Sequence, residues 1–318
     1  MIRDFPTGSS PALRARVDAH AKSGKRDLQR LRPASIVMIV RDGAEGLELF
    51  MLKQVGMMDQ SPATVLLPGG GVDGRDGDDA LPWAGPDAFE WGIRLGTDKS
   101  GARVLVVAAV REVFEECGFL LASKEEDGPL VDVAGEMWRA AREGLIGREL
   151  SLAELLIGHD LVLRSDLLRA HAHWVTPDFE PKRYDMRVFV ARMPESQAAV
   201  VTRRDPLTAG WFTPASIIAA HQAGEVVLTP TALVCIEDAG RFASADELFD
   251  HTPVIRAIEP TLVAADDGSI VLRVDTDGRR EEPGQRREEP GQRREEAHQR
   301  REEAHQRREE PDGAVGKS

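Results

Sequence analysis

The chain has 318 residues, of which 42% are hydrophobic and 30% are charged, and its formal net charge is −13. This composition is typical of a globular protein, and the length is sufficient for one large domain or two small ones. No apolar run approaches the ~20 residues that cross a bilayer, so we expect no membrane partner. The acidic charge argues against nucleic-acid binding, which depends on clustered lysine and arginine side chains.

Two features of the sequence indicate a cytoplasmic location. Cys117 and Cys235 are the only cysteines, which are too few for a disulfide framework and suit a reducing compartment. The first residues, Met1–Pro6, do not place a basic segment before an apolar stretch, so we expect no secretory signal. Nothing in these patterns predicts an oligomeric state.

The first hundred residues predict an arm, a hairpin and an insertion. Residues 1–30 are polar and form an N-terminal arm, either a short helix or a loose segment. The apolar runs Ser35–Val40 and Leu47–Leu52 flank a turn signal, which is typical of a β-hairpin. Residues 77–103 are rich in Asp, Gly, Pro and Trp, and we expect an irregular insertion there with a helical turn around Asp87–Ile93.

The remaining segments alternate between strand and helix character. Strand patterns occur at 64–67, 161–163, 173–176, 187–192, 211–213 and 270–274. Helical patterns occur at 136–156 with a break near 144–147, at 213–222 and at 230–237. This alternation predicts an α/β fold.

A further helix is predicted over Val104–Cys117 by apolar residues at spacings of three and four. Its apolar stripe consists of Val106, Ala109, Val110, Val113 and Cys117. Gly118 follows as a helix stop signal. We therefore expect Cys117 to be a packing residue, since no His/Asn partner set suggests a nucleophile.

Residues 276–318 form a low-complexity charged tail. A seven-residue repeat begins at Glu281–Arg287 and recurs to Glu310, without apolar residues that would form a coiled-coil seam. Pro283 and Pro290 interrupt any helix in the first copies. We expect a solvated tail, part helical and part disordered, with the folded domain ending near residue 275.

Three glutamates share one face of the helix over Val104–Cys117. Glu112, Glu115 and Glu116 lie at i, i+3 and i+4, and only Arg111 is near enough to offset their repulsion. A divalent cation would remove that repulsion, because magnesium takes oxygen ligands and often joins carboxylates to substrate phosphates. The alternative is a solvated acidic helix face.

The context of the glutamates resembles the Nudix box. The segment Arg111–Phe119 matches the Arg-Glu-apolar-x-Glu-Glu-x-Gly-apolar half of the box at each fixed position, and Leu67–Asp73 resembles its glycine turn. The first half departs from the family after Gly70. Asp76 stands where the family has a glutamate, and residues 77–110 separate it from Arg111 where the family usually has seven residues.

An insertion at this place resembles the branch of the peroxisomal coenzyme A diphosphatase. Four other segments look like that branch, namely 32–35, 174–177, 183–189 and 211–214. The resemblance implies a hydrolase domain over 31–275, with the insertion at 77–110. It also implies an α/β/α sandwich around a mixed β-sheet.

The resemblance assigns roles to the residues of the box. Glu112, Glu115 and Glu116 correspond to metal ligands, which implies Mg²⁺, with Mn²⁺ as a possible substitute. Arg111 corresponds to the arginine that fixes a glutamate by charge-assisted hydrogen bonds, and the family's base would be Glu112 or Glu115. Asp76 is either a shorter ligand or part of a loop.

Other polar residues are candidates for substrate contact. Lys53, Arg183 and Arg187 are candidate phosphate contacts, against the alternative that each is a surface charge. His173 is either a substrate contact or a half-buried structural histidine. In the insertion, Trp83, Phe89 and Trp91 either line an apolar channel for a pantetheine arm or anchor the insertion to the core. The sequence does not decide between these two alternatives.

The resemblance implies hydrolysis of a diphosphate linkage in a small molecule. The leading substrate is coenzyme A or an acyl-coenzyme A. The alternatives are another nucleoside diphosphate derivative, such as ADP-ribose or a dinucleotide, and a non-catalytic protein that senses a ligand.

Overall fold

The computed structural model describes residues 2–7, 14–19, 30–54, 62–198 and 207–276. The chain divides into two units, Met1–Gly278 and Arg279–Ser318. Except for Thr276, the predicted tail over 276–318 lies outside the described residues. The fold described below is therefore that of the first unit.

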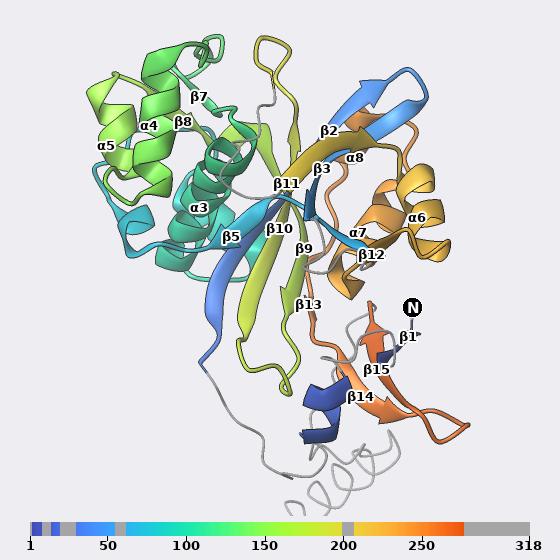
Figure 1. Ribbon diagram of the computed structural model, residues 1–318. Helices are drawn as coiled ribbons and strands as arrows, with labels where there is room; N and C mark the ends of the chain where they lie inside the picture. The colour runs from blue at the N-terminus through green and yellow to red at the C-terminus, as the bar shows by residue number, and fades with distance from the viewer. Residues whose placement is uncertain (1, 8–13, 20–29, 55–61, 199–206, 277–318) are drawn as a thin grey trace, which may run out of the picture. The chain divides into compact units, whose positions relative to one another are not determined.

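A mixed β-sheet forms the centre of this unit (Figure 1). In the part of the chain that the structure describes it has nine strands, with the order β12-β4-β3-β2-β10-β9-β13, β11 beside β3 and β5 beside β2. The strands are β2 (Arg32–Gly43), β3 (Gly46–Gln54), β4 (Ala63–Leu66), β5 (Gly69–Gly71), β9 (Leu168–Val175), β10 (Tyr184–Arg192), β11 (Leu207–Phe212), β12 (Val226–Leu228) and β13 (Ala257–Ile258). Strands β2 and β10 are parallel, and β2 and β3 are antiparallel.

The β2–β3 hairpin follows the alternation that its sequence predicts. Ile39 pairs with Phe50, and the turn closes at Gly43 and Gly46. Gly46 has a φ of 105°, a conformation that residues with a Cβ rarely adopt. Along β2, Val37 and Ile39 contact one apolar core, whereas Met38 and Val40 contact the other.

Helices cover both faces of the sheet (Figure 1). One core includes side chains of α2 (Ala88–Leu95), α3 (Lys99–Cys117), α4 (Glu136–Ile146) and α5 (Leu152–Gly158). The other includes side chains of α6 (Pro214–Gln222), α7 (Pro230–Ala239) and α8 (Ala245–Asp250). This arrangement confirms the predicted α/β/α sandwich around a mixed sheet.

Two small sheets complete the unit. Strands β6 (Trp83–Ala84), β7 (Ala122–Ser123) and β8 (Val162–Arg164) form one, and β1 (Ile2–Pro6), β14 (Thr261–Ala264) and β15 (Ile270–Asp275) form the other. No helix among the described residues combines the length and apolar character required to traverse a membrane.

The N-terminal segment differs from the expected short helix or loose arm in its first part. Its first part is strand β1, in which Ile2 pairs with Asp275 and Phe5 with Leu272. Residues 14–19 are helical, and Val17 is buried in a small cluster with Phe179 and Leu272. A strand of five residues gives little periodic signal, and its partner lies at the other end of the unit.

The segment 77–103 contains more regular structure than we expected. Helix α2 extends to Leu95, with Asp87 and Glu90 forming a capping box and Gly96 ending it at a φ of 64°. Helix α3 begins at Lys99 rather than at Val104, because the Asp98 side chain accepts a hydrogen bond from the Gly101 amide. The range 77–110 therefore includes the first turns of α3.

The aromatic residues of this segment do not share one environment. Trp91 is fully buried, and its ring lies 5.8 Å from that of Phe189 in an edge-to-face arrangement. The Trp83 indole N–H donates to the carbonyl oxygen of Pro86 at 2.8 Å. Phe89 is 63% exposed. Trp91 thus anchors α2 to β10, as the second of the two sequence interpretations holds.

The burial of Trp91 predicts a large effect on stability. We expect Trp91→Ala to lower the free energy of unfolding by about 3–5 kcal/mol, because it leaves a cavity between α2 and the sheet. Denaturant unfolding would measure this loss. The control is Phe89→Ala on the same helix, which should change stability by less than about 1 kcal/mol. Equal losses in the two variants would contradict the anchoring role.

Candidate active site

Arg111 is the centre of a buried network of hydrogen bonds between α3 and the glycine turn. Its Nε and Nη2 donate to the two carboxylate oxygens of Asp76 at 2.9 and 3.0 Å. Its Nη1 donates to Glu112 at 2.8 Å and to Glu115 at 3.1 Å. The remaining Nη2 hydrogen is directed at the carbonyl oxygen of Gly71, at 2.9 Å. Each of the five guanidinium N–H groups thus has an acceptor.

Asp76 forms the other side of this network. It lies in the 3₁₀ helix η2 (Gly74–Gly77) and is 2% exposed. Besides its bidentate pair with Arg111, its Oδ2 accepts a hydrogen bond from the Asp73 amide at 2.7 Å. The sequence left open whether Asp76 is a shorter ligand or part of a loop; in the structure its carboxylate is instead bonded to Arg111, a role that neither alternative includes. Burial opposes the charge of Arg111, but the carboxylates around it raise its pKa above the ordinary value.

Glu112 and Glu116 face the glycine turn. The Gly69 amide donates to Glu116 Oε2 at 2.7 Å. A Cβ placed on Gly70 would lie 2.4 Å from Glu112 Oε1, and one on Gly69 would lie 2.3 Å from the carbonyl oxygen of Ser35. A glycine is therefore required at position 69, where the backbone of β2 is so close and φ is 152°, whereas a Cβ at position 70 would displace the Glu112 carboxylate.

The sheet holds this turn against the helix. Strand β5 is antiparallel to β2, with Gly70 opposite Ser35 and Gly69 opposite Ile36. The buried hydroxyl of Ser35 donates to the carbonyl oxygen of Leu105 in α3 at 2.6 Å. One strand thus fixes both the turn and the helix that carries the glutamates.

The glutamates carry more negative charge than their surroundings offset. Burial raises the pKa of Glu112 to about 6 and that of Glu116 to about 7, and the neighbouring glutamates add to both shifts. Arg142, which donates to the backbone carbonyl of Glu115 at 2.9 Å, acts against the shift of Glu116. The surroundings of Glu112 and Glu116 therefore favour an additional positive charge.

The donors at this site suit a hard divalent cation, because they are carboxylate oxygens. In the structure, however, these carboxylates are not grouped closely enough to form one metal site. In the part of the chain that the structure describes, no three His, Cys, Asp or Glu side chains lie close enough together to hold a metal ion. Glu112 and Glu115 are instead bonded to Arg111, and Glu116 to Gly69. The chemistry of the donors fits a metal, and Arg111 Nη1 is bonded to both Glu112 and Glu115.

The predicted phosphate contacts lie in different surroundings. Arg187 is buried and donates to the Leu95 carbonyl and to Asp185, at 2.9 and 2.6 Å. Arg183 is also buried and donates to Glu259 at 2.6 Å. Lys53 lies half-buried in β3. His173 is half-buried and contacts Asp185. The role of Lys53, Arg183 and Arg187 as substrate contacts stays a prediction.

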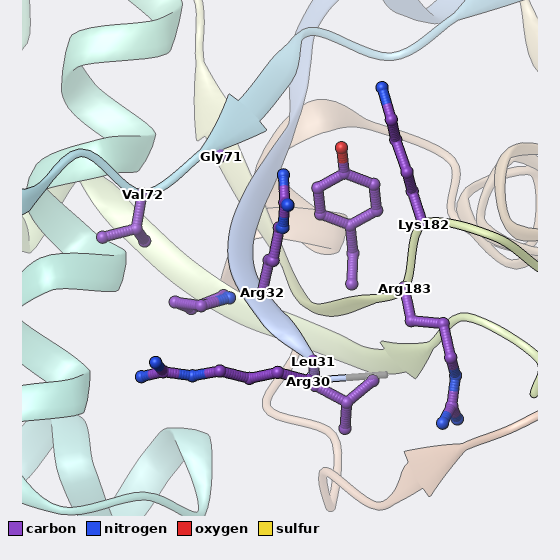
Figure 2. A pocket seen from close by; sticks show the side chains of 9 residues that line it. Arg30, Leu31, Arg32, Gly71, Val72, Lys182 and Arg183 are labelled. Atoms are coloured by element: carbon purple, nitrogen blue, oxygen red, sulfur yellow. The ribbon is translucent and has the colours of Figure 1, made fainter. Parts of the chain in front are cut away.

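Two pockets meet at Gly71 and Val72. The first, which we call the carboxylate pocket, has a volume of about 340 Å³. It is lined by Asp73, Arg75, Arg111, Glu112, Glu115, Leu145, Ile146 and Arg148, together with Gly71 and Val72. The second, which we call the cationic pocket, has a volume of about 700 Å³ (Figure 2). It is lined by Arg30, Leu31, Arg32, Pro33, Lys182, Arg183 and Tyr184, again with Gly71 and Val72.

Sequence reasoning singled out Arg183 but missed the other basic residues of the cationic pocket. Arg32 and Tyr184 are neighbours because they begin the parallel strands β2 and β10. Lys182 precedes β10, and Arg30 precedes β2. The four residues come from two segments that are far apart in the sequence, so local patterns do not group them.

Comparison with known proteins identifies the fold. No protein-family model and no curated protein matches the chain. Among solved structures, a NUDIX hydrolase from Alicyclobacillus acidocaldarius is 22% identical with a TM-score of 0.56, covering 71% of this chain and 99% of that one. The chain has the Nudix fold.

Two more distant structures also match. An Ap4A hydrolase of C. elegans is 14% identical with a TM-score of 0.32, covering 66% of this chain and 97% of that one. A mutator MutT protein from Bacillus halodurans is 8% identical with a TM-score of 0.36, covering 77% and 98%.

The close approach of Gly70 to Glu112 predicts a local effect of substitution. We expect Gly70→Ala to reduce any activity of this site by about tenfold or more, because the new methyl group displaces the Glu112 carboxylate and a misplacement of about 1 Å is costly. Steady-state kinetics would measure the loss. The control is Gly74→Ala, where a Cβ meets nothing within 4 Å. Full activity of Gly70→Ala would show that the position of Glu112 is unimportant.

Proposed function

We propose that this protein is a metal-dependent hydrolase that cleaves a diphosphate linkage in a small molecule. The observation that supports this most is the juxtaposition of Glu112, Glu115 and Glu116 with Arg111 and the glycine turn, in a chain with the Nudix fold. A merely solvated acidic helix face would not bury Glu112 or hold a half-buried Glu116 against the backbone of a strand.

In this proposal, Glu112, Glu115 and Glu116 hold Mg²⁺, or Mn²⁺ in its place. The bound ion would draw charge from the diphosphate oxygens and lower the pKa of a water molecule. The protein's own part is to position the carboxylates. Arg111 fixes Glu112 and Glu115 and is itself held by Asp76. Either Glu112 or Glu115 would serve as the base that accepts the proton of the attacking water.

The proposed substrate is coenzyme A or an acyl-coenzyme A. This choice is supported by the resemblance of the box, with its segment 77–110, to the coenzyme A diphosphatase branch. ADP-ribose and dinucleotides are the competing substrates. The proposal also takes the catalytic domain as 31–275, the tail over 276–318 as a non-catalytic addition, and the cytoplasm as the location, on the grounds of composition and cysteine content.

The metal proposal predicts a severe loss of turnover on removing one glutamate charge. We expect Glu116→Gln to lower kcat by about 100-fold or more, because the ion would lose a charged ligand. An excess of EDTA should abolish activity, and added Mg²⁺ should restore it. Circular dichroism would verify that the variant is folded. Full turnover in Glu116→Gln or in EDTA would exclude a metal held by α3.

The substrate proposal predicts a preference that a panel assay with Mg²⁺ would measure. We expect kcat/KM for coenzyme A to exceed that for ADP-ribose by about tenfold, a difference of ~1.4 kcal/mol in transition-state binding. Equal or better hydrolysis of ADP-ribose would favour the competing substrates. Absence of hydrolysis across the panel, with measurable binding, would favour a ligand-sensing protein.

A further inference from the structure

The cationic pocket lies where two parallel strands begin. The Arg32 amide donates to the carbonyl oxygen of Arg183 at 3.0 Å, and the Val72 amide donates to that of Pro33 at 3.0 Å. These bonds tie the starts of β2 and β10 to the segment that follows β5. The position of the pocket is therefore set by backbone pairing rather than by long side chains alone.

Three cations of this pocket have no acidic partner within the described residues. Arg30, Arg32 and Lys182 are exposed, and no ion pair joins them to another described residue. Arg183 differs, because its guanidinium is bonded to Glu259 and to the Thr176 carbonyl. Figure 2 shows Arg32 and Lys182 extending to the same side of the backbone, whereas Arg183 runs the opposite way.

The nearby acidic side chains are engaged elsewhere. Asp185, next to Tyr184, contacts His173 and Arg187. Glu180, two residues before Lys182, pairs with Arg16 at 3.1 Å. In a chain with a formal net charge of −13, three cations that line one pocket and have no acidic partner among the described residues form a local positively charged site.

The cationic pocket adjoins the carboxylate pocket. Both are lined by Gly71 and Val72, and the Gly71 carbonyl accepts a hydrogen bond from Arg111. A ligand that places a diphosphate at the carboxylates therefore has its neighbouring group within reach of Arg32 and Lys182. Arginine and lysine bind phosphate by charge-assisted hydrogen bonds, and a phosphomonoester carries about −1.5 to −2 charges at neutral pH.

We propose that Arg32 and Lys182 form a subsite for a phosphomonoester on the ribose of a nucleoside diphosphate substrate. This inference rests on the proposed function for its orientation, because the diphosphate of the same molecule lies at the carboxylate pocket. The substrate class is then a diphosphate that bears an additional phosphate one sugar away. Coenzyme A, with its 3′-phosphate, belongs to this class, and dephospho-coenzyme A does not.

The kinetic test compares these two compounds, which differ only in that phosphate. Wild-type enzyme should favour coenzyme A in kcat/KM by about tenfold or more. In a protein carrying both Arg32→Gln and Lys182→Gln, the ratio should fall toward one through loss on coenzyme A, with dephospho-coenzyme A hydrolysed as before. Lys99→Gln, which removes one exposed lysine charge outside both pockets, should retain the wild-type ratio.

A binding test separates this inference from the proposed hydrolysis. Calorimetry without metal should show tighter binding of adenosine 3′,5′-bisphosphate than of AMP, and the double variant should lose the difference. This result would support the subsite even if no diphosphate is hydrolysed. Equal binding of both nucleotides, or a preference that survives the double substitution, would overturn the inference.

A third arm addresses free anions as the ligand. Inorganic phosphate should bind wild-type protein far more weakly than adenosine 3′,5′-bisphosphate does, since it lacks the nucleoside. Binding of inorganic phosphate that depends on Arg32 and Lys182, together with a coenzyme A to dephospho-coenzyme A ratio near one, would assign the pocket to a free anion and contradict a substrate subsite. Melting temperatures of all variants would verify that each is folded.

Discussion

The site depends on the single guanidinium of Arg111. It is buried, and its five donors reach Asp76, Glu112, Glu115 and the backbone of Gly71. Removing one partner of such a buried network leaves the other charged groups buried without a counter-charge. The loss of one partner of a buried ion pair lowers the stability of a protein strongly. The helix, the 3₁₀ helix and the glycine turn therefore keep their positions together. The same residue that stabilises the fold also orders the carboxylates.

The Asp76–Arg111 pair also explains how the segment 77–110 is accommodated. Its two ends meet at a bidentate ion pair, so the intervening residues leave the site and return to the same point. The entropic cost of closing a loop grows slowly with its length, so a long excursion adds little once its ends are fixed. Trp91 and the capped helix α2 then pack the excursion against the core that it shares with the sheet. The geometry around Glu112 therefore does not depend on the number of residues between Asp76 and Arg111.

Much of the fold followed from local patterns. Alternating apolar residues predicted the β2–β3 hairpin, and the 3–4 spacing predicted the part of α3 that carries the glutamates. The apolar spacing predicts a start at Val104, later than the observed start of α3 at Lys99, although Asp98 is an N-cap residue three positions before the Gly101 amide that it binds. In the same way, Asp87 and Glu90 form a recognisable capping box for α2. By contrast, the position of Arg32 beside Tyr184 depends on the parallel pairing of distant strands, which no local pattern records. The pairing of Asp76 with Arg111 likewise requires knowing that residues 35 positions apart meet.

The sheet of β1, β15 and β14 has a consequence for how the domain is made. Strand β1 leaves the ribosome before the other described strands of the domain, and its partner β15 follows only after they have been synthesised. Until then, β1 presents unpaired backbone groups, which are open to association with other chains. Closing this contact also spans the largest sequence separation among the described strand pairs, which is typical of slow steps. Polar residues such as Arg3 and Asp4 keep the waiting strand from being an apolar edge, and once paired, Asp4 is bonded to Arg273. Among the described strands, the one that is synthesised first is thus among the last to be paired.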